Sequence, residues 1–246
     1  MPVYAGCDRP LIADWVGAEY VHGQDGMGDA FFPPAKQRPE REHAVDELVR
    51  RIDESPGELT ILAQAPLTNI AAAVVRDPSI ARKVKHLYVM GGGTGNITPA
   101  AEFNFYVDPE AAKIVLKSGF PTTLFTWTLT LSHGVFDDAK LDELHALDTP
   151  LTRFFEQVNR KALEFERSTG IQGSTHPDSM VAGAIVDPSL VLATRECFVD
   201  VETGGTLTRG YSVIDTLGTL GKEPNATVVE AFDVDRFYEL LKGVLA

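Results

Sequence analysis

The sequence predicts an α/β fold with a mostly parallel sheet flanked by helices. From about residue 58 onward, short apolar runs alternate with amphipathic runs that begin at proline or aspartate. This alternation is typical of parallel strands joined by right-handed helical crossovers. The 246 residues, of which 44% are hydrophobic, can bury one large core, so we expect a single domain over residues 1–246.

The first elements are indicated by local start and stop signals. Apolar runs predict strands over residues 58–64, 85–92 and 121–129. Between them, a helix is expected over residues 66–78, opened by a proline and closed before an Asp-Pro pair. A second helix is expected over residues 108–119, with Asp108 as its N-cap and a glycine as its end.

The later elements follow the same reasoning. Residues 151–166 show a regular apolar face, which predicts a helix packed on the core. Residues 179–192 predict a buried helix that ends at an Asp-Pro pair, and residues 233–246 predict a terminal amphipathic helix. Between these two, residues 197–215 alternate around a glycine pair like an antiparallel hairpin.

Composition excludes several classes of function. Lys and Arg total 22 against 35 Asp and Glu, and a net charge of −13 would repel nucleic acid. No apolar run reaches the roughly 18 residues of a membrane span, and the start lacks a signal peptide, so we expect a cytoplasmic protein. Cys7 and Cys197 have no metal-site spacing and are expected to be reduced thiols.

A polar trio follows the second predicted strand. Asn96, Glu102 and Asn104 offer one carboxylate and two carboxamides, which can donate to and accept from vicinal hydroxyls such as those of a sugar. Ligands of such sheets bind beyond the carboxyl ends of the strands, and the glycines before the trio allow close backbone approach. The alternative is local: the asparagines make turns and the carboxylate is solvated.

Five segments, in order, resemble the inosine-uridine-preferring nucleoside hydrolase family. They span residues 2–11, 21–29, 61–71, 89–93 and 95–112. The resemblance implies a Rossmann-like, mostly parallel sheet flanked by helices. It also implies calcium-assisted hydrolysis of the N-glycosidic bond of ribonucleosides, which gives ribose and free base. The implied partners are a small-molecule ribonucleoside and further copies of the chain, as a dimer or tetramer.

The resemblance also implies roles for individual residues. The polar trio would bind the ribose hydroxyls, and Met90 would line the pocket. Thr68 would bind Ca²⁺ through its backbone carbonyl. His22 would face the nucleoside, although it could instead be a loop histidine that caps a turn. Trp127 could stack on the base or belong to the core.

The implied chemistry suits these residue types. Glycosidic cleavage passes through an oxocarbenium-like state, and a carboxylate such as Glu102 stabilises the positive charge that develops on the ribose. A calcium ion with about six to eight oxygen ligands can orient the hydroxyls and lower the pKa of a bound water.

The chain departs from the family pattern by lacking an Asp-rich run of the form DxDxGxDD. In the family this run supplies calcium carboxylates and the base that deprotonates water. The acidic pairs at residues 137–138 and at Asp233 with Asp235 are expected to be solvated helix starts instead. We therefore expect a fold without its N-terminal strand-helix portion, and a chain that alone binds calcium poorly and hydrolyses nucleosides little.

A second departure lies at residues 173–183. Asp178 occupies the place of a calcium-binding aspartate, with a plain helix N-cap as the alternative. The family's preceding histidine is replaced by Pro177, and His176 lies one residue earlier. Because proline cannot donate a proton, the candidates for protonating the leaving base are His176 and His22, with an aromatic stack as another route.

Two classes of function remain open on the sequence. One is a ribonucleoside N-glycosidase, and the other is a non-catalytic relative that binds ribose or serves in assembly. An in-frame Asp-rich segment encoded upstream of Met1 would favour the enzyme. A serine hydrolase is disfavoured because no GxSxG occurs.

Overall fold

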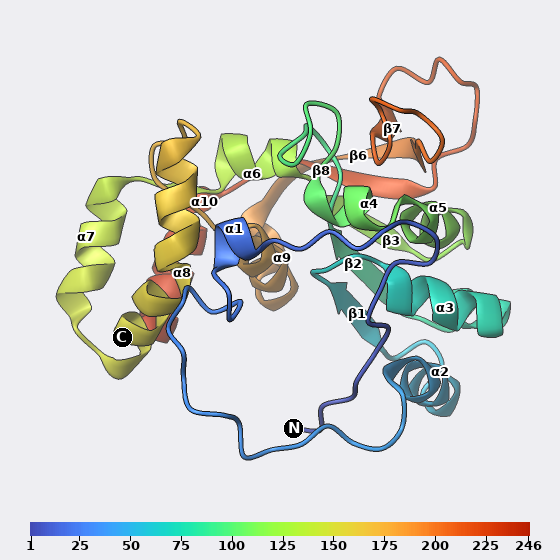
Figure 1. The fold of residues 1–246 in the computed structure, drawn as a ribbon. Coiled ribbons are helices and arrows are strands. Elements are labelled where there is room, and N and C mark those ends of the chain that lie inside the picture. The colour runs from blue at the N-terminus through green and yellow to red at the C-terminus, as the bar shows by residue number, and fades with distance from the viewer. The chain divides into compact units, whose positions relative to one another are not determined.

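The computed structural model describes residues 1–246, which form two compact units (Figure 1). The sheet unit contains residues 1–15, 36–129 and 193–230. The helical unit contains residues 16–35, 130–192 and 231–246. The single domain expected from the sequence stays a prediction.

A six-stranded sheet has the order β1-β2-β3-β8-β6-β7. Its strands are β1 (Thr60–Ala63), β2 (His86–Met90), β3 (Thr122–Phe125), β6 (Val191–Val201), β7 (Ser212–Asp215) and β8 (Ala226–Phe232). The strands β1, β2, β3 and β8 pair in parallel, with Ile61 opposite Leu87 in the first pair. β6 and β7 pair antiparallel, so both the parallel sheet and the hairpin are confirmed.

Helices pack beside these strands. They are α2 (Ala44–Glu54), α3 (Thr68–Arg76), α4 (Phe103–Val107), α5 (Pro109–Lys117) and the short 3-10 helix η1 (Pro78–Arg82). Figure 1 shows α2, α3 and α5 stacked beside the sheet, and α3 packs against both of the others. Fully buried Leu87 and Leu124 place the core between this layer and the strands.

Local signals explain the bounds of these elements. The Asp108 side chain accepts a hydrogen bond from the Ala111 amide and so caps α5, while Gly119, at φ +83°, ends it. The strand expected over residues 121–129 was wrong beyond Phe125. The hydroxyl of Thr126 accepts from the Leu129 amide at 3.2 Å and starts α6 (Trp127–His133) there.

The helical unit carries the remaining elements. They are α1 (Glu19–His22), β4 (Val135–Phe136), α7 (Asp138–Leu147), α8 (Pro150–Ser168), β5 (Ser174–Thr175), α9 (Pro177–Val186), η2 (Pro188–Leu190) and α10 (Val234–Leu245). The side chains of Asp137 and Asp233 cap α7 and α10, which confirms them as helix-start charges. No helix of the chain has the length and apolar character needed to cross a membrane.

Candidate functional site

A glycine loop leaves the carboxyl end of β2. Gly92 and Gly93 have φ values of +72° and +89°, which favour glycine because it lacks a Cβ. Every amide from Gly91 to Thr94 already has a protein acceptor. These acceptors are the Phe125 carbonyl at 3.0 Å, Glu102 Oε2 at 2.9 Å, Ser212 Oγ at 2.7 Å and Thr128 Oγ1 at 2.8 Å, in that order. The loop is therefore held in one conformation from several sides.

Glu102 fixes this loop to the start of α4. Its side chain is 2% exposed, which excludes the solvated alternative. Oε1 accepts from the Asn104 amide at 2.8 Å, and Oε2 accepts from the amides of Gly92 at 2.9 Å and Phe105 at 3.1 Å. The carboxylate is thus a buried negative charge held by three backbone donors at the carboxyl end of β2.

The two predicted amide side chains lie on either side of this carboxylate in sequence. Asn104 is buried, and its Nδ2 donates to the Met90 carbonyl at 3.1 Å and lies 3.3 Å from the Met90 sulfur. Asn96 is exposed, and its Oδ1 accepts from the Phe103 amide at 2.8 Å. The structure therefore brings Met90, Asn96, Glu102 and Asn104 together through one loop and one helix start.

The backbone of Trp127 is hydrogen-bonded to the same loop. Its amide donates to the Gly92 carbonyl at 2.9 Å, and its side chain is half-buried at the start of α6. This bond puts the backbone of Trp127 next to the glycine loop. Base stacking by Trp127 stays a prediction.

Thr68 is hydrogen-bonded to Asp108, a buried aspartate that the sequence predicted only as a helix cap. Thr68 Oγ1 donates to Asp108 Oδ2 at 2.6 Å, and the Leu11 amide donates to the same oxygen at 2.9 Å. Asp108 is fully buried and also caps α5. No local pattern signals this connection, because Leu11 and Asp108 lie 97 residues apart.

A cavity of about 700 Å³ opens beside Thr68 in the sheet unit. It is lined by residues 6–11 together with His43 and Thr68. The cavity places Thr68 next to open space.

The helical unit holds three of the predicted site residues. His22 ends α1 and is exposed. His176 is 5% exposed, with its ring 4.7 Å from that of Phe136 and 5.2 Å from that of Phe155. Burial lowers the pKa of His176 to about 4, and its Nε2 has no hydrogen-bond partner. The imidazole is therefore uncharged at pH 7, which disfavours it as a general acid.

Asp178 lies in the first turn of α9. The N-cap alternative is wrong, because the N-cap position belongs to His176 and carries no side-chain capping bond. Although the Asp178 side chain reaches solvent, desolvation by the surrounding protein raises its pKa to about 6.

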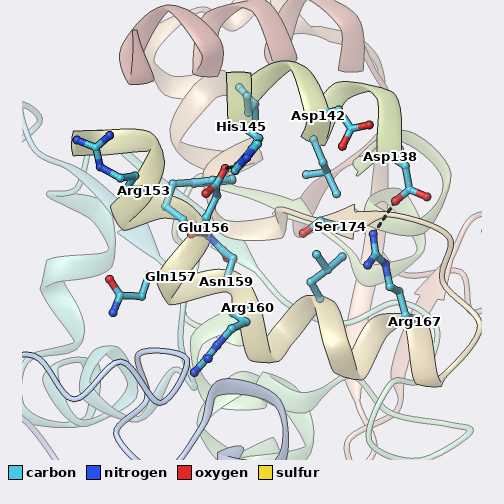
Figure 2. Close-up of a pocket in the computed structure, with 14 residues that line it drawn as sticks. Asp138, Asp142, His145, Arg153, Glu156, Gln157, Asn159, Arg160, Arg167 and Ser174 are labelled. Atoms are coloured by element: carbon cyan, nitrogen blue, oxygen red, sulfur yellow. Dashed lines mark hydrogen bonds and ion pairs between the residues drawn. The ribbon is translucent and has the colours of Figure 1, made fainter. Parts of the chain in front are cut away.

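A second cavity of about 700 Å³ lies between α7 and α8 in the helical unit (Figure 2). Its charged lining is largely paired. Arg167 Nη2 lies 2.7 Å from Asp138 Oδ1, and His145 Nδ1 lies 2.9 Å from Glu156 Oε1. None of the site residues predicted from the sequence lines this cavity.

The donor set does not fit a calcium ion. Calcium takes about six to eight oxygen ligands, several of them carboxylates. No group of three or more His, Cys, Asp or Glu side chains is placed to hold a metal ion. Asp108, the carboxylate bonded to Thr68, already accepts from three protein donors. Thr68 and Asp178 alone do not make a calcium site.

Comparisons with known proteins agree with this fold. The family model described as inosine-uridine preferring nucleoside hydrolase matches residues 1–239. The pyrimidine-specific ribonucleoside hydrolase RihB of Escherichia coli O1:K1 / APEC is 32% identical over 245 residues, which cover 98% of this chain and 78% of that protein.

Two solved structures are also similar. A plant nucleoside hydrolase, the PpNRh1 enzyme, superposes with a TM-score of 0.91 at 30% identity, covering 100% of this chain and 80% of that one. The purine-preferring ribonucleoside hydrolase of Gardnerella vaginalis gives a TM-score of 0.89 at 26% identity, covering 99% and 79%. This chain therefore belongs to the inosine-uridine preferring nucleoside hydrolase family.

Proposed function

We propose that this chain binds the ribose of a nucleoside at the carboxyl end of β2, as part of a ribonucleoside N-glycosidase that releases ribose and free base. The observation that carries the proposal is the buried Glu102 carboxylate, fixed by three amides beside Asn104 and Met90. The similar proteins differ in the base they name, since one is pyrimidine-specific and another purine-preferring. Ribose is the part of the substrate that their names share.

The arrangement supports this chemistry as follows. Glu102 carries its negative charge in a buried place, where it stabilises positive charge developing on the ribose more strongly than it would in water. Asn104 uses an Nδ2 proton on Met90, which fixes the amide and directs its Oδ1 as an acceptor for a hydroxyl. Asn96 uses its Oδ1 on the backbone, which directs its amide protons as donors.

His176 is disfavoured as the donor of a proton to the leaving base, and protonation by His22 stays a prediction. His22 is exposed, whereas His176 lies between two phenylalanine rings and has a pKa of about 4. A group with so low a pKa is almost entirely unprotonated at pH 7. Self-association of the chain as a dimer or tetramer stays a prediction.

The substrate of this site is a nucleoside without a 5′-phosphate. Loops at this position of an open α/β sheet often bind phosphate through unused amides, but here the amides of residues 91–94 are all occupied. The Glu102 carboxylate would also repel a phosphate. We expect uridine 5′-monophosphate to bind about 10-fold or more weakly than uridine by calorimetric titration. Equal affinities would contradict this selectivity.

Turnover by residues 1–246 alone is expected to be slow or absent. The side chains that would hold calcium and deprotonate the attacking water are not assembled among these residues. Ribose release from inosine and uridine, with calcium added, should fall far below the roughly 1 to 1000 per second of typical enzymes. Rates in that range would show that these residues do assemble the groups that activate the attacking water.

One observation favours the non-catalytic alternative: no group of three or more His, Cys, Asp or Glu side chains is placed to hold a metal ion. Such a chain would hold a nucleoside without the groups that cut it. Calorimetric titration with inosine and uridine separates the outcomes. Binding without ribose release supports both the sugar-binding proposal and the inference that the calcium-binding side chains are not assembled among these residues. Absence of binding, with the chain folded, would overturn the ribose site itself.

A further inference from the structure

Ser212 joins the glycine loop to the start of β7. Its side chain is 4% exposed. Its hydroxyl accepts a hydrogen bond from the Gly93 amide at 2.7 Å and donates to the Gly93 carbonyl at 3.5 Å. One side chain therefore holds both polar atoms of a residue that lies 119 positions earlier in the sequence.

The contact is close as well as polar. A Cβ placed on Gly92 would lie 3.1 Å from both Cβ and Oγ of Ser212, which leaves almost no space between the loop and the strand. Gly92 and Gly93 both have positive φ. Without a fixed partner, glycine also populates many other backbone conformations. A fixed partner is needed to hold such a flexible pair of residues in one arrangement.

The segment before Ser212 is itself anchored on α4, the helix that Glu102 begins. Arg209 Nη2 donates to the Tyr106 carbonyl at 2.7 Å, and its guanidinium carbon lies 4.5 Å from the centre of the Tyr106 ring. Gly210 has φ +78°, and a Cβ there would lie 2.6 Å from the Tyr106 Cα, so only glycine allows this approach. The β6–β7 connection thus contacts both the glycine loop and α4.

We propose that Ser212 is a positioning residue for the ribose site: it holds the Gly91–Gly93 loop in the conformation that places Asn96, Glu102 and the Met90 carbonyl around the sugar. This inference rests on the proposed function, since it concerns the same site. Ser212 reaches the sugar only through the loop. Removing its hydroxyl leaves the Gly93 amide without its partner and lets the glycine pair populate other conformations.

The test compares Ser212→Ala with the control Thr219→Ala. Thr219 is an exposed hydroxyl residue that follows the same strand, and its amide and its hydroxyl both donate to Asp215 Oδ1. Hydrogen exchange of backbone amides is followed by NMR, and the dissociation constants for D-ribose and uridine are measured on the same samples. In Ser212→Ala, exchange of the amides of residues 92–94 should rise about 5-fold or more, and ligand affinity should fall by a similar factor. Thr219→Ala should change neither.

The outcomes separate the role of Ser212 from that of the site. Faster exchange confined to residues 92–94, together with weaker ligand binding in Ser212→Ala, supports positioning. Unchanged exchange at these amides overturns it, as does faster exchange spread evenly over the chain, which would indicate loss of stability alone. If the unsubstituted protein binds neither D-ribose nor uridine, the proposed function fails. The local exchange measurement then still decides whether Ser212 holds the loop.

Discussion

Replacing Glu102 with alanine should lower the free energy of unfolding by about 3 kcal/mol and abolish nucleoside binding. The substitution removes the acceptor of three amides, those of Gly92, Asn104 and Phe105, in a place that water does not reach. Loss of a helix N-cap costs about 1 kcal/mol, and each buried donor left unpaired adds about 1 kcal/mol or more. Urea denaturation measures the first effect, and calorimetric titration with uridine measures the second.

Glu58→Ala is the matched control for this experiment. Glu58 is an exposed glutamate of the same unit, and its removal should change the free energy of unfolding by less than about 0.5 kcal/mol. Glu102→Gln should retain part of the stability but lose the negative charge. A Glu102→Ala variant that is as stable as the control would show that the carboxylate does not hold the loop.

Replacing Asp108 with alanine is expected to cost about 3 to 4 kcal/mol of folding stability. Asp108 is fully buried, caps α5, and accepts from Thr68 Oγ1 and the Leu11 amide. Its loss therefore leaves two amides and a hydroxyl unpaired in the sheet unit. Urea denaturation of this variant should show the drop. Asp8→Ala, which removes an 89% exposed carboxylate that lines the cavity beside Thr68, should be near neutral.

A double-mutant cycle with Thr68→Val sharpens this result. Thr68→Val removes one of the three hydrogen bonds, and its effect should shrink once Asp108 is already absent. Full additivity of the two substitutions would mean that the 2.6 Å contact between the two side chains contributes nothing to stability.

Features governed by neighbouring residues could be predicted from the sequence. The cap of α5 by Asp108 and the glycine that ends it are signals contained within one helix and its flanks. The order of alternating strands and helices likewise predicted the parallel pairing of β1, β2 and β3. The polar trio after β2 was found because its residues are close in sequence and follow a strand end.

Features that depend on distant pairing could not. The bond from Ser212 to Gly93 and the bond from the Leu11 amide to Asp108 join residues 119 and 97 positions apart, and no periodicity marks either partner. The helix start at Trp127 was missed because β-branched and aromatic residues on both sides of Thr126 favour a strand, and a single capping hydroxyl outweighs them. The phenylalanine rings around His176 come from α8 and β4, which local sequence does not reveal.

Titration of isotope-labelled protein with uridine, followed by amide NMR, tests whether ribose binds where Glu102 is held. The largest chemical-shift changes are predicted at the backbone amides of residues 91–104. Asn104→Ala, which removes the side-chain amide beside Met90, should make these changes smaller. Saturable binding whose shifts lie elsewhere, such as around the cavity between α7 and α8, would contradict the account. The absence of any shift at uridine concentrations well above about 1 mM would also contradict it, because a dissociation constant of about 1 mM corresponds to a binding free energy of only about −4 kcal/mol.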